Sequence, residues 1–410
     1  MNWWSQFPLS LRQVVRIRLL ASFGAGGVLY MTPLVFHQVN FSASKIGQGL
    51  AASAIIGFIS RFSCGLFLDR GLACSWPVRM AAALSIFANF VLVQATGFTS
   101  YLGGQLLIGM ATGLYFPAIE LAVPLSCGNF PSSRGYALAR SADALGVAIG
   151  ASTGVIVTGL GIIRAIYVID IISASMIILI LSQELFINKY TVVIQEETRS
   201  NSRGKCFLPA SSPKWLLPLI PILILTIVAT STITLRQSAL PLDLVRGSLE
   251  RPPLSEVWSG ALIALHLALL MLLQWPVGSW VARRNAYFGL GIGLVSLSLG
   301  FALIALSSLF SRGLVLLLLA ELPLAFGEAA FLPTAAEAVL GEVPIKHRGL
   351  AMALFSQCFA ISASTIPLLA GILLDAEGNG LLLWSLAAMA CLATLPMLNN
   401  VRQRYFIRNW

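Results

Sequence analysis

Charged side chains are scarce in this sequence. Asp, Glu, Lys and Arg together make up 10% of its 410 residues, whereas hydrophobic residues make up 57%. A soluble protein carries roughly a quarter charged residues, and a surface this apolar would expose larger patches than water tolerates. The shortage of charge therefore excludes an ordinary soluble protein and indicates an integral membrane protein.

The sequence also lacks the short motifs of several enzyme classes. It contains no His-Glu-x-x-His zinc motif, no Gly-x-x-x-x-Gly-Lys-Ser/Thr phosphate loop and no Cys-x-x-Cys pair. A metallopeptidase would need the first motif, and a nucleotide-driven pump would need the second or a partner chain that carries it. The six cysteines fall mostly in or near apolar stretches, where they act as small buried residues. We expect no enzyme activity, no cofactor, no metal site and no disulfide framework.

What the sequence does contain is long apolar runs. A helix needs about 20 apolar residues to cross the hydrocarbon core of a bilayer. The first run is too long for the core of a signal peptide and lacks a cleavage site of small residues, so it should stay in place as a helix. We predict an all-α integral membrane protein with twelve transmembrane helices, near residues 17–39, 44–68, 78–98, 101–126, 134–160, 163–186, 214–236, 255–281, 285–309, 313–340, 348–374 and 380–400.

A polar segment divides these spans into six and six. Residues 187–213, INKYTVVIQEETRSNSRGKCFLPASSP, are mixed in charge and end in Ser-Ser-Pro, as a linker does. They separate residues 1–186 from residues 214–410. The two halves also repeat, because SRGYALA recurs 214 positions later as HRGLAMA, and CGLFLDR recurs 213 positions later as VGSWVAR. Pseudo-symmetric halves are typical of transporters, whose substrate site lies near the midplane between them.

The net charge of +10 is explained by membrane orientation. If both termini lie inside, 20 of the 26 Lys and Arg residues fall in inner segments or at inner helix ends, among them Arg18 and Arg61. The other 6, which include Arg236, fall on the outer side. Basic residues gather on the cytoplasmic side of membrane proteins in this way. We therefore expect a multi-pass protein of the cell (inner) membrane, with both termini and the linker in the cytoplasm and no nucleic acid partner.

An acid and a base end the second predicted span, in the stretch GLFLDRG. Its Gly65, Asp69 and Arg70 resemble the loop signature G-x-L-a-D-r-x-G-r-k that the major facilitator superfamily carries between helices 2 and 3. The second copy of the repeat keeps Gly278 and Arg283. The resemblance covers the whole chain in topology and only short motifs in sequence. It implies a transporter that works by alternating access, with this stretch, called the gate loop below, at its inner face.

The resemblance also gives a role to the acid of the gate loop. Asp69 beneath the positive N-terminus of a neighbouring helix, or facing Arg134, would hold the inner face closed. In the second copy Ala282 stands where the acid would be. An ordinary loop at the membrane surface is the alternative interpretation of the same residues.

The motifs that separate subfamilies fit less well. Proton-coupled exporters of this superfamily usually carry R-x-x-x-G in helix 4, and here Gln105 stands four residues before Gly109. Antiporters carry G-x-x-x-G-P-x-x-G-G in helix 5, and here Ala151 follows Gly150 in place of the proline. These differences weaken the hypothesis of an antiporter without excluding it. The chain still resembles the drug and metabolite exporters of the superfamily.

Charged residues inside the membrane are costly, which makes them candidates for function. Glu120 and Arg140 fall at about the same depth by the rise of a helix, so they can pair, with Asp143 one turn further on. These three residues are candidates for proton coupling. A structural ion pair near the inner gate is an equally good interpretation.

The tenth predicted span carries two acids on one face. Glu321 and Glu328 are seven residues apart, and Glu328 and His266 both fall near the middle of their spans. A carboxyl group in a low-dielectric cavity takes up a proton near neutral pH, and histidine titrates there already. Glu328 and His266 are therefore the first candidates for handling a proton. The alternative is a permanently neutral Glu328 and a histidine packed against a carbonyl group.

The resemblance implies a central cavity lined by the first, fourth, seventh and tenth helices. The residues on these helices that we expect to contact the solute are Tyr30, Gln105, Tyr115, Phe116, Glu321 and Phe326. A mostly apolar and aromatic lining suits amphipathic molecules. We therefore expect a monomer that moves a small amphipathic molecule out of the cell, with protons as the coupling ion. Uptake of a polar nutrient on the same fold is the alternative.

Overall fold

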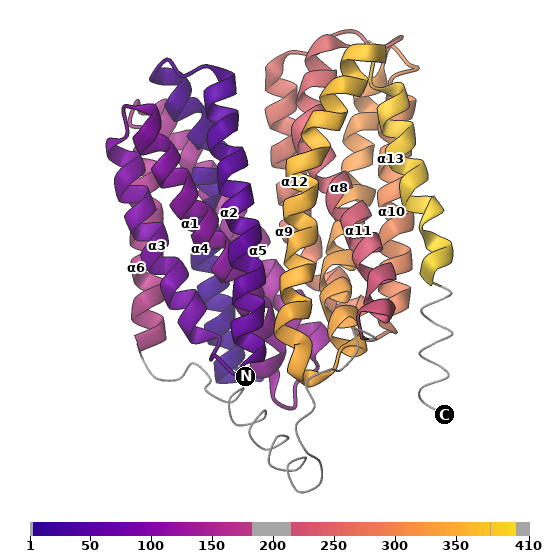
Figure 1. Cartoon of the computed structure of the whole chain (residues 1–410). Helices are drawn as coiled ribbons and strands as arrows, with labels where there is room; N and C mark the ends of the chain where they lie inside the picture. Colours follow the sequence, from indigo (N-terminus) through magenta and orange to yellow (C-terminus); the bar gives the residue numbers. More distant parts are fainter. Residues whose placement is uncertain (1–2, 183–214, 378, 399–410) are drawn as a thin grey trace, which may run out of the picture. The chain divides into compact units, whose positions relative to one another are not determined.

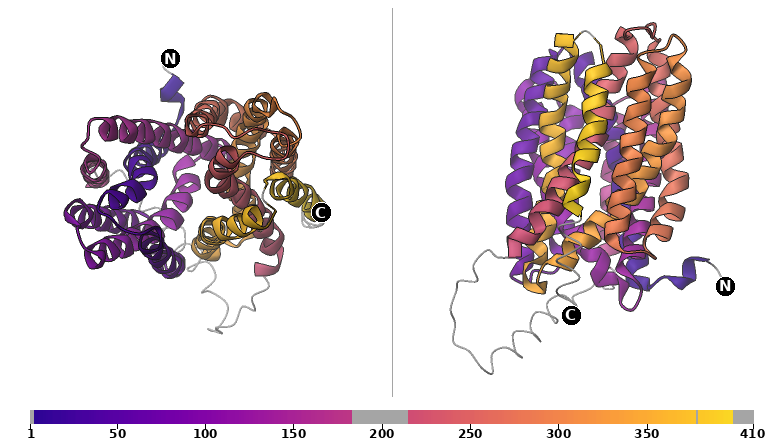
Figure 2. Two further views of the ribbon diagram at one scale, coloured as in Figure 1. Left: turned by 90° about the horizontal axis from the view of Figure 1, so that it is seen from above. Right: turned by 90° about the vertical axis from the view of Figure 1, so that its right-hand side faces the viewer.

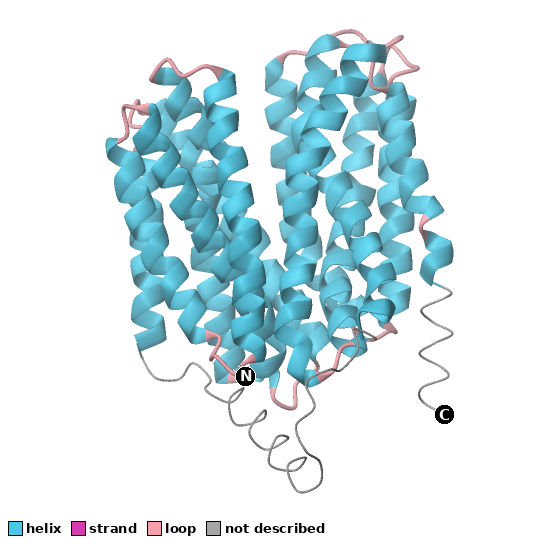
Figure 3. Ribbon diagram, in the orientation of Figure 1, coloured by secondary structure: helices cyan, strands magenta, loops and turns pink. Residues whose placement is uncertain are grey.

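The computed structural model describes residues 3–182, 215–377 and 379–398. In this part of the chain every regular element is a helix (Figure 3). Twelve of the described helices are long and apolar enough to cross a membrane, which confirms the predicted all-α, twelve-span fold. The predicted linker, residues 187–213, lies outside the described residues, so the boundary between the two halves stays a prediction.

The chain forms two compact units (Figure 1). Unit 1 consists of Met1–Trp215 with Val343–Gln357, and unit 2 of Leu216–Glu342 with Cys358–Trp410. The helices before the linker are η1 Trp3–Gln6, α1 Leu9–Gln38, α2 Ala43–Asp69, α3 Ser75–Gln94, α4 Phe98–Cys127, α5 Ser132–Gly159 and α6 Ala165–Ser182. The helices after it are α8 Leu216–Arg246, α9 Glu256–Val281, α10 Ala286–Ser307, α11 Gly313–Glu342, η3 Ile345–His347, α12 Arg348–Glu377 and α13 Leu381–Ala393.

Several helices extend beyond the apolar runs that predicted them. Helix α1, for example, begins at Leu9, well before the apolar core of its span. The added turns contain Arg12 and Arg16, and arginine is a good helix former although it is polar. The helix continues without a break through Arg18, whose side chain is buried in the interior of unit 1.

Glycines set the closest helix contacts in unit 1. Helix α1 packs against α5 and α6, α2 against α4, and α3 against α4 and α6. A Cβ atom on Gly150 of α5 would lie 2.1 Å from the Phe23 carbonyl oxygen, and one on Gly109 of α4 would lie 2.2 Å from that of Ser53. Only glycine permits backbones to approach this closely. The spacing brings polar side chains of α1, α4 and α5 within reach of one another.

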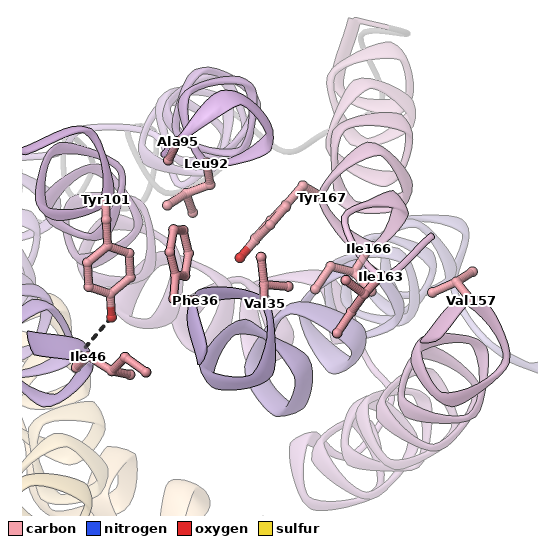
Figure 4. Close-up of a cluster of buried hydrophobic side chains, with 10 residues drawn as sticks. All are labelled: Val35, Phe36, Ile46, Leu92, Ala95, Tyr101, Val157, Ile163, Ile166 and Tyr167. Carbon is pink, nitrogen blue, oxygen red and sulfur yellow. Dashed lines mark hydrogen bonds between the residues drawn. The ribbon is translucent and has the colours of Figure 1, made fainter. Parts of the chain in front are cut away.

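An apolar cluster joins the helices of unit 1 near one end (Figure 4). The Tyr101 hydroxyl donates a hydrogen bond to the Ile46 carbonyl oxygen at 2.8 Å, which satisfies the polar tip of this buried ring. The buried members of the cluster are Val35, Phe36, Ile46, Leu92, Ala95, Tyr101, Val157, Ile163, Ile166 and Tyr167. Because they come from α1 to α6, the cluster fixes all six helices against one another.

A buried ion pair holds one end of unit 2 together. Figure 2 draws the helix ribbons of this unit, coloured from pink to yellow, in two further views. Arg251, in the connection between α8 and α9, lies 2.7 Å from Asp243 Oδ2 and donates to Ser307 Oγ on α10 at 2.7 Å. The indole of Trp384 on α13 donates to the same Asp243 oxygen at 3.0 Å. The two buried charges compensate each other, and with Ser307 and Trp384 this contact fixes α8, α10 and α13 at one end. The polar residues of α9 and α11 lie elsewhere in the unit.

Candidate functional site

Three side chains meet in the interior of unit 2. His266 lies on α9, while Glu321 and Glu328 lie about two turns apart on one face of α11. The imidazole Nδ1 is 2.9 Å from Glu321 Oε2, and Nε2 is 3.2 Å from Glu328 Oε2. His266 and Glu321 are buried, and Glu328 is only slightly exposed. These residues, called the carboxylate–imidazole trio below, join α9 to α11 through both ring nitrogens.

A cation stands beside the trio. Arg236 of α8 is buried, and its Nη1 lies 3.9 Å from Glu321 Oε2. In an interior from which water is excluded, this charge compensates one ionised carboxylate. Arg236, a protonated imidazole and two ionised carboxylates sum to zero charge.

The geometry of the trio requires a shared proton. A neutral imidazole has one N–H group and one bare nitrogen. The bare nitrogen would face a carboxyl oxygen, so that carboxyl group must carry a proton unless the imidazole itself is protonated. Both arrangements hold one proton more than a neutral imidazole with two carboxylates. Loss of that proton would set two lone pairs against each other and leave a net negative charge in the interior.

Four charged side chains meet in the interior of unit 1. Glu120 of α4 lies 3.1 Å from Arg18 Nη2 on α1 and 2.8 Å from Arg140 Nη2 on α5. Asp143 of α5 pairs with Arg18 as well, and its Oδ2 lies 3.8 Å from Arg140 Nη1. Ser22 donates a hydrogen bond to Asp143 Oδ1 at 3.1 Å. This ion-pair quartet contains two cations and two anions, so its charges balance without an added proton.

The quartet contains three of the sequence candidates and one residue that was missed. Glu120, Arg140 and Asp143 were expected at similar depth, and the structure brings them together. Arg18 was counted only among the basic residues at the inner helix ends, because it stands early in the first span. Each carboxylate has two guanidinium groups as partners, and protonating it would leave one of them without its counter-charge. The arrangement favours a permanent ion-pair network over a proton carrier.

The acid of the gate loop binds the start of another helix. Asp69 is the last residue of α2, and α12 begins at Arg348. Asp69 Oδ1 accepts a hydrogen bond from the Gly349 backbone nitrogen at 2.7 Å, and Oδ2 accepts one from Leu350 at 3.2 Å. N–H groups in the first turn have no partner within their own helix. Of the two arrangements considered for Asp69, the structure has the helix N-terminus.

The other gate candidates lie apart from this contact. The guanidinium carbon of Arg134 lies 5.2 Å from the centroid of the Phe130 ring, as in a cation–π contact. Arg70 is exposed. In unit 2 the Gly278 carbonyl oxygen accepts the hydrogen bond that caps α9, and Arg283 is exposed. Their part in gating stays a prediction.

The expected solute contacts of unit 1 lie mainly on α4. Gln105 is buried there. The Tyr115 hydroxyl is also enclosed and has no hydrogen-bond partner among the described residues. Phe116 is 37% exposed. The side chain of Tyr30 lies outside the described residues.

In unit 2 the expected solute contacts lie on α11. Glu321 belongs to the trio, and the half-buried Phe326 ring lies 6.5 Å from the Trp280 ring, centroid to centroid. A hollow of about 570 Å³ opens elsewhere in the unit, and none of the predicted site residues lines it. Its walls consist of Asn285, Tyr287, Phe288, Leu392, Leu395, Pro396 and Leu398.

Two further charges inside the membrane spans were not singled out from the sequence. Asp170 of α6 accepts hydrogen bonds from Ser85 and Asn89 of α3. Arg61 of α2 is buried. Each of these charges interrupts an apolar run and can be recognised in the sequence. Its neighbours cannot, because the sequence of a helix that is apolar on all sides does not show which face packs against other helices.

Comparison with known proteins identifies the fold. No model of a known protein family matches the sequence, and no curated protein matches it. Among solved structures, the chain is similar to the crystal structure of a bacterial homologue of the iron transporter ferroportin in an outward-facing state. The TM-score is 0.71 at 17% sequence identity, and the match covers 96% of this chain and 99% of the other. With its twelve spans, the chain therefore has the fold of a major facilitator-type transporter.

Proposed function

We propose that this protein is a secondary active transporter that exports a small amphipathic molecule, driven by protons that enter in exchange. The transporter-type fold supports transport across the membrane. The carboxylate–imidazole trio is the observation that supports a proton as the coupling ion. It is buried, it joins two helices, and its two hydrogen bonds need one proton more than a neutral imidazole with two carboxylates supplies.

The trio couples its proton to helix contact in a simple way. With the proton present, His266 binds Glu321 and Glu328 and holds α9 against α11. Without it, one nitrogen lone pair faces a carboxylate, and that contact becomes repulsive. A difference of this kind biases an equilibrium between two conformations, as alternating access requires. Arg236 compensates the charge of one carboxylate whether or not the trio carries its proton.

A proton fits the trio better than a metal cargo does. The similar solved structure is described as a homologue of an iron transporter, and iron is a property of that protein. Here each nitrogen of His266 faces a carboxyl oxygen at hydrogen-bonding distance. Within residues 3–182, 215–377 and 379–398, no group of three or more His, Cys, Asp and Glu side chains is arranged to hold a metal ion. Both ring nitrogens and one oxygen of each carboxyl group are thus engaged with one another in hydrogen bonds.

Membrane vesicles of both orientations test the proposal. A panel of fluorescent amphipathic dyes would be offered to inside-out and right-side-out vesicles, with and without a proton gradient. We expect inside-out vesicles that contain the protein to accumulate at least one dye, and a proton ionophore to abolish the accumulation. Accumulation only in right-side-out vesicles would make the protein an importer. Accumulation that survives the ionophore would overturn proton coupling.

A further inference from the structure

Arg61 stands out among the buried charges because it has no counter-charge within the described residues. It is 8% exposed, and it forms no ion pair or hydrogen bond with any side chain or backbone group in the described part of the chain. The other buried arginines among the described residues each lie within 4 Å of a carboxylate oxygen; they are Arg18, Arg236 and Arg251. A charge inside a membrane span that lacks a counter-charge is costly and marks a functional site.

The Arg61 side chain runs toward the middle of its helix. Side chains on a helix lean toward its N-terminus, and Arg61 Nη1 lies 3.0 Å from the position of a Cβ atom on Gly57, one turn earlier. Gly57 is close to the midpoint of α2, which spans Ala43–Asp69. An arginine this near the end of a span would ordinarily extend toward the nearer membrane surface. The guanidinium group instead occupies space that the missing side chain of Gly57 leaves open.

An aromatic ring lies beneath the guanidinium group. The central carbon of Arg61 is 5.7 Å from the centroid of Phe116 on α4, whose ring is partly exposed. A guanidinium group placed over a ring keeps the N–H groups of its edge free for an acceptor. Its Nε is enclosed and has no acceptor within the described residues. The edge of the guanidinium group is therefore a donor site that lacks its anion.

We propose that Arg61 binds the carboxylate of an amphipathic organic anion, with the apolar part of the molecule against Phe116. The planar guanidinium edge matches a carboxylate through two parallel hydrogen bonds. One cation balances one negative charge, which favours a monoanion over a doubly charged phosphate. This inference names the solute class of the proposed transporter and rests on that proposal. The binding itself is an equilibrium property that needs no proton gradient.

Thermal unfolding of the purified full-length protein tests the proposal, because a ligand that binds the folded state raises Tm. The probes are benzoate, naphthoate and decanoate, each compared with the alcohol and the amine of the same carbon skeleton and with inorganic phosphate. We expect a saturable rise in Tm with at least one carboxylate and none with its matched alcohol or amine. Absence of any carboxylate effect, or an equal effect of the alcohol, would overturn the proposal. A rise with phosphate alone would replace the carboxylate by a phosphate.

Variants assign the effect to Arg61. Arg61→Met should lower the carboxylate affinity by about tenfold or more, since a charge-assisted bidentate contact is lost. Arg16→Met, at an exposed arginine of α1, is the matched control and should bind normally. Without ligand, Arg61→Met should unfold at the same temperature as the wild type or higher, because an uncompensated buried charge is removed. A clear fall in its ligand-free Tm below that of the control would show that Arg61 has a partner in the protein and would overturn the proposal.

A second pair of variants tests the space around the guanidinium group. Gly57→Ala places a methyl group 3.0 Å from Arg61 Nη1 and should weaken carboxylate binding. Gly47→Ala on the same helix meets nothing within 4 Å and should leave it unchanged. Equal carboxylate binding by both variants would contradict a binding site beside Gly57 at the Arg61 guanidinium group. Failure of these binding tests leaves proton-driven transport standing, and loss of proton coupling leaves carboxylate binding standing, so the two proposals fail separately.

Discussion

Asp69 Oδ1 accepts a hydrogen bond from the backbone nitrogen of Gly349 at 2.7 Å, which places the acid of the gate loop on the first turn of α12. The positive end of a helix favours an anion by about 0.3–1 kcal/mol at exposed positions and up to about 2 kcal/mol when partly buried. Asp69→Asn keeps an acceptor and removes the charge. We expect a folded protein whose transport rate changes, measured at matched expression. An unchanged rate would reduce the gate loop to an ordinary connection.

Close backbone packing beside Asp69 gives a second prediction. A Cβ atom on Gly65 would lie 3.0 Å from the Gly349 carbonyl oxygen and 2.7 Å from the Ala353 Cβ. Gly65→Ala should therefore destabilise the protein by about 1–3 kcal/mol through overpacking. Gly47→Ala on the same helix has open space around it and should be neutral or stabilising by up to about 1 kcal/mol. Denaturant unfolding of both variants gives the comparison, and equal stabilities would contradict the packing.

The ion-pair quartet predicts a large effect for one neutralised carboxylate. Glu120→Gln leaves two buried arginines with one carboxylate, which should lower the free energy of unfolding by about 3–5 kcal/mol. The control is Asp375→Asn, because its pair with Arg246 is exposed, with side-chain exposures of 69% and 47%. Such a pair contributes about 0–1 kcal/mol. Equal losses in the two variants would show that Glu120 is not part of a compensated network.

Membrane orientation is tested at Cys206, which lies outside the described residues. The distribution of basic residues predicts that it faces the cytoplasm. The five described cysteines are buried, and burial raises the pKa of the Cys74 thiol to about 12, so that it stays protonated and unreactive near neutral pH. An impermeant maleimide should therefore label the protein only after the cells are permeabilised. Labelling in intact cells that Cys206→Ser abolishes would reverse the predicted orientation.

The sequence predicts the fold more fully than it predicts the site. Apolar runs and a repeat are local patterns, and they were sufficient for twelve spans. The depth of a charge along its helix is also local, so Glu120 and Arg140, and Glu328 and His266, were matched correctly by depth. The partners Arg18 and Arg236 were not found, because both were assigned to the membrane surfaces when the basic residues were counted.

What the sequence could not supply is the direction in which each helix faces. Glu321 was expected to contact the solute because it lies on one of the helices expected to line the cavity, and the structure places it against His266 Nδ1. Arg61 was counted as an inner basic residue, and the structure places its guanidinium group beside Gly57. In a helix that is apolar nearly all round, periodicity does not define a buried face. Such contacts depend on which helices pack together, and that information is not local.

Removal of the imidazole predicts a change in pH dependence. His266→Ala leaves Glu321 beside Arg236 and takes from Glu328 the group that shares its proton. We expect the pH profile of transport to move more than the maximal rate falls, because the imidazole tunes the acids without replacing them. Initial rates across a pH series give the profile. A uniform loss of rate with an unmoved profile would make His266 a structural residue.

The most direct test of the account is accumulation of solute in proteoliposomes that contain Glu328→Gln protein, under an imposed pH gradient. Gln keeps the size of the side chain and can donate a hydrogen bond to the imidazole, but it fixes the position as neutral. Glu250→Gln, at an exposed acid, is the control. The account predicts that Glu328→Gln protein binds solute and exchanges it across the membrane, yet no longer concentrates it in response to the gradient. Accumulation equal to that of the control would contradict a coupling proton on the carboxylate–imidazole trio.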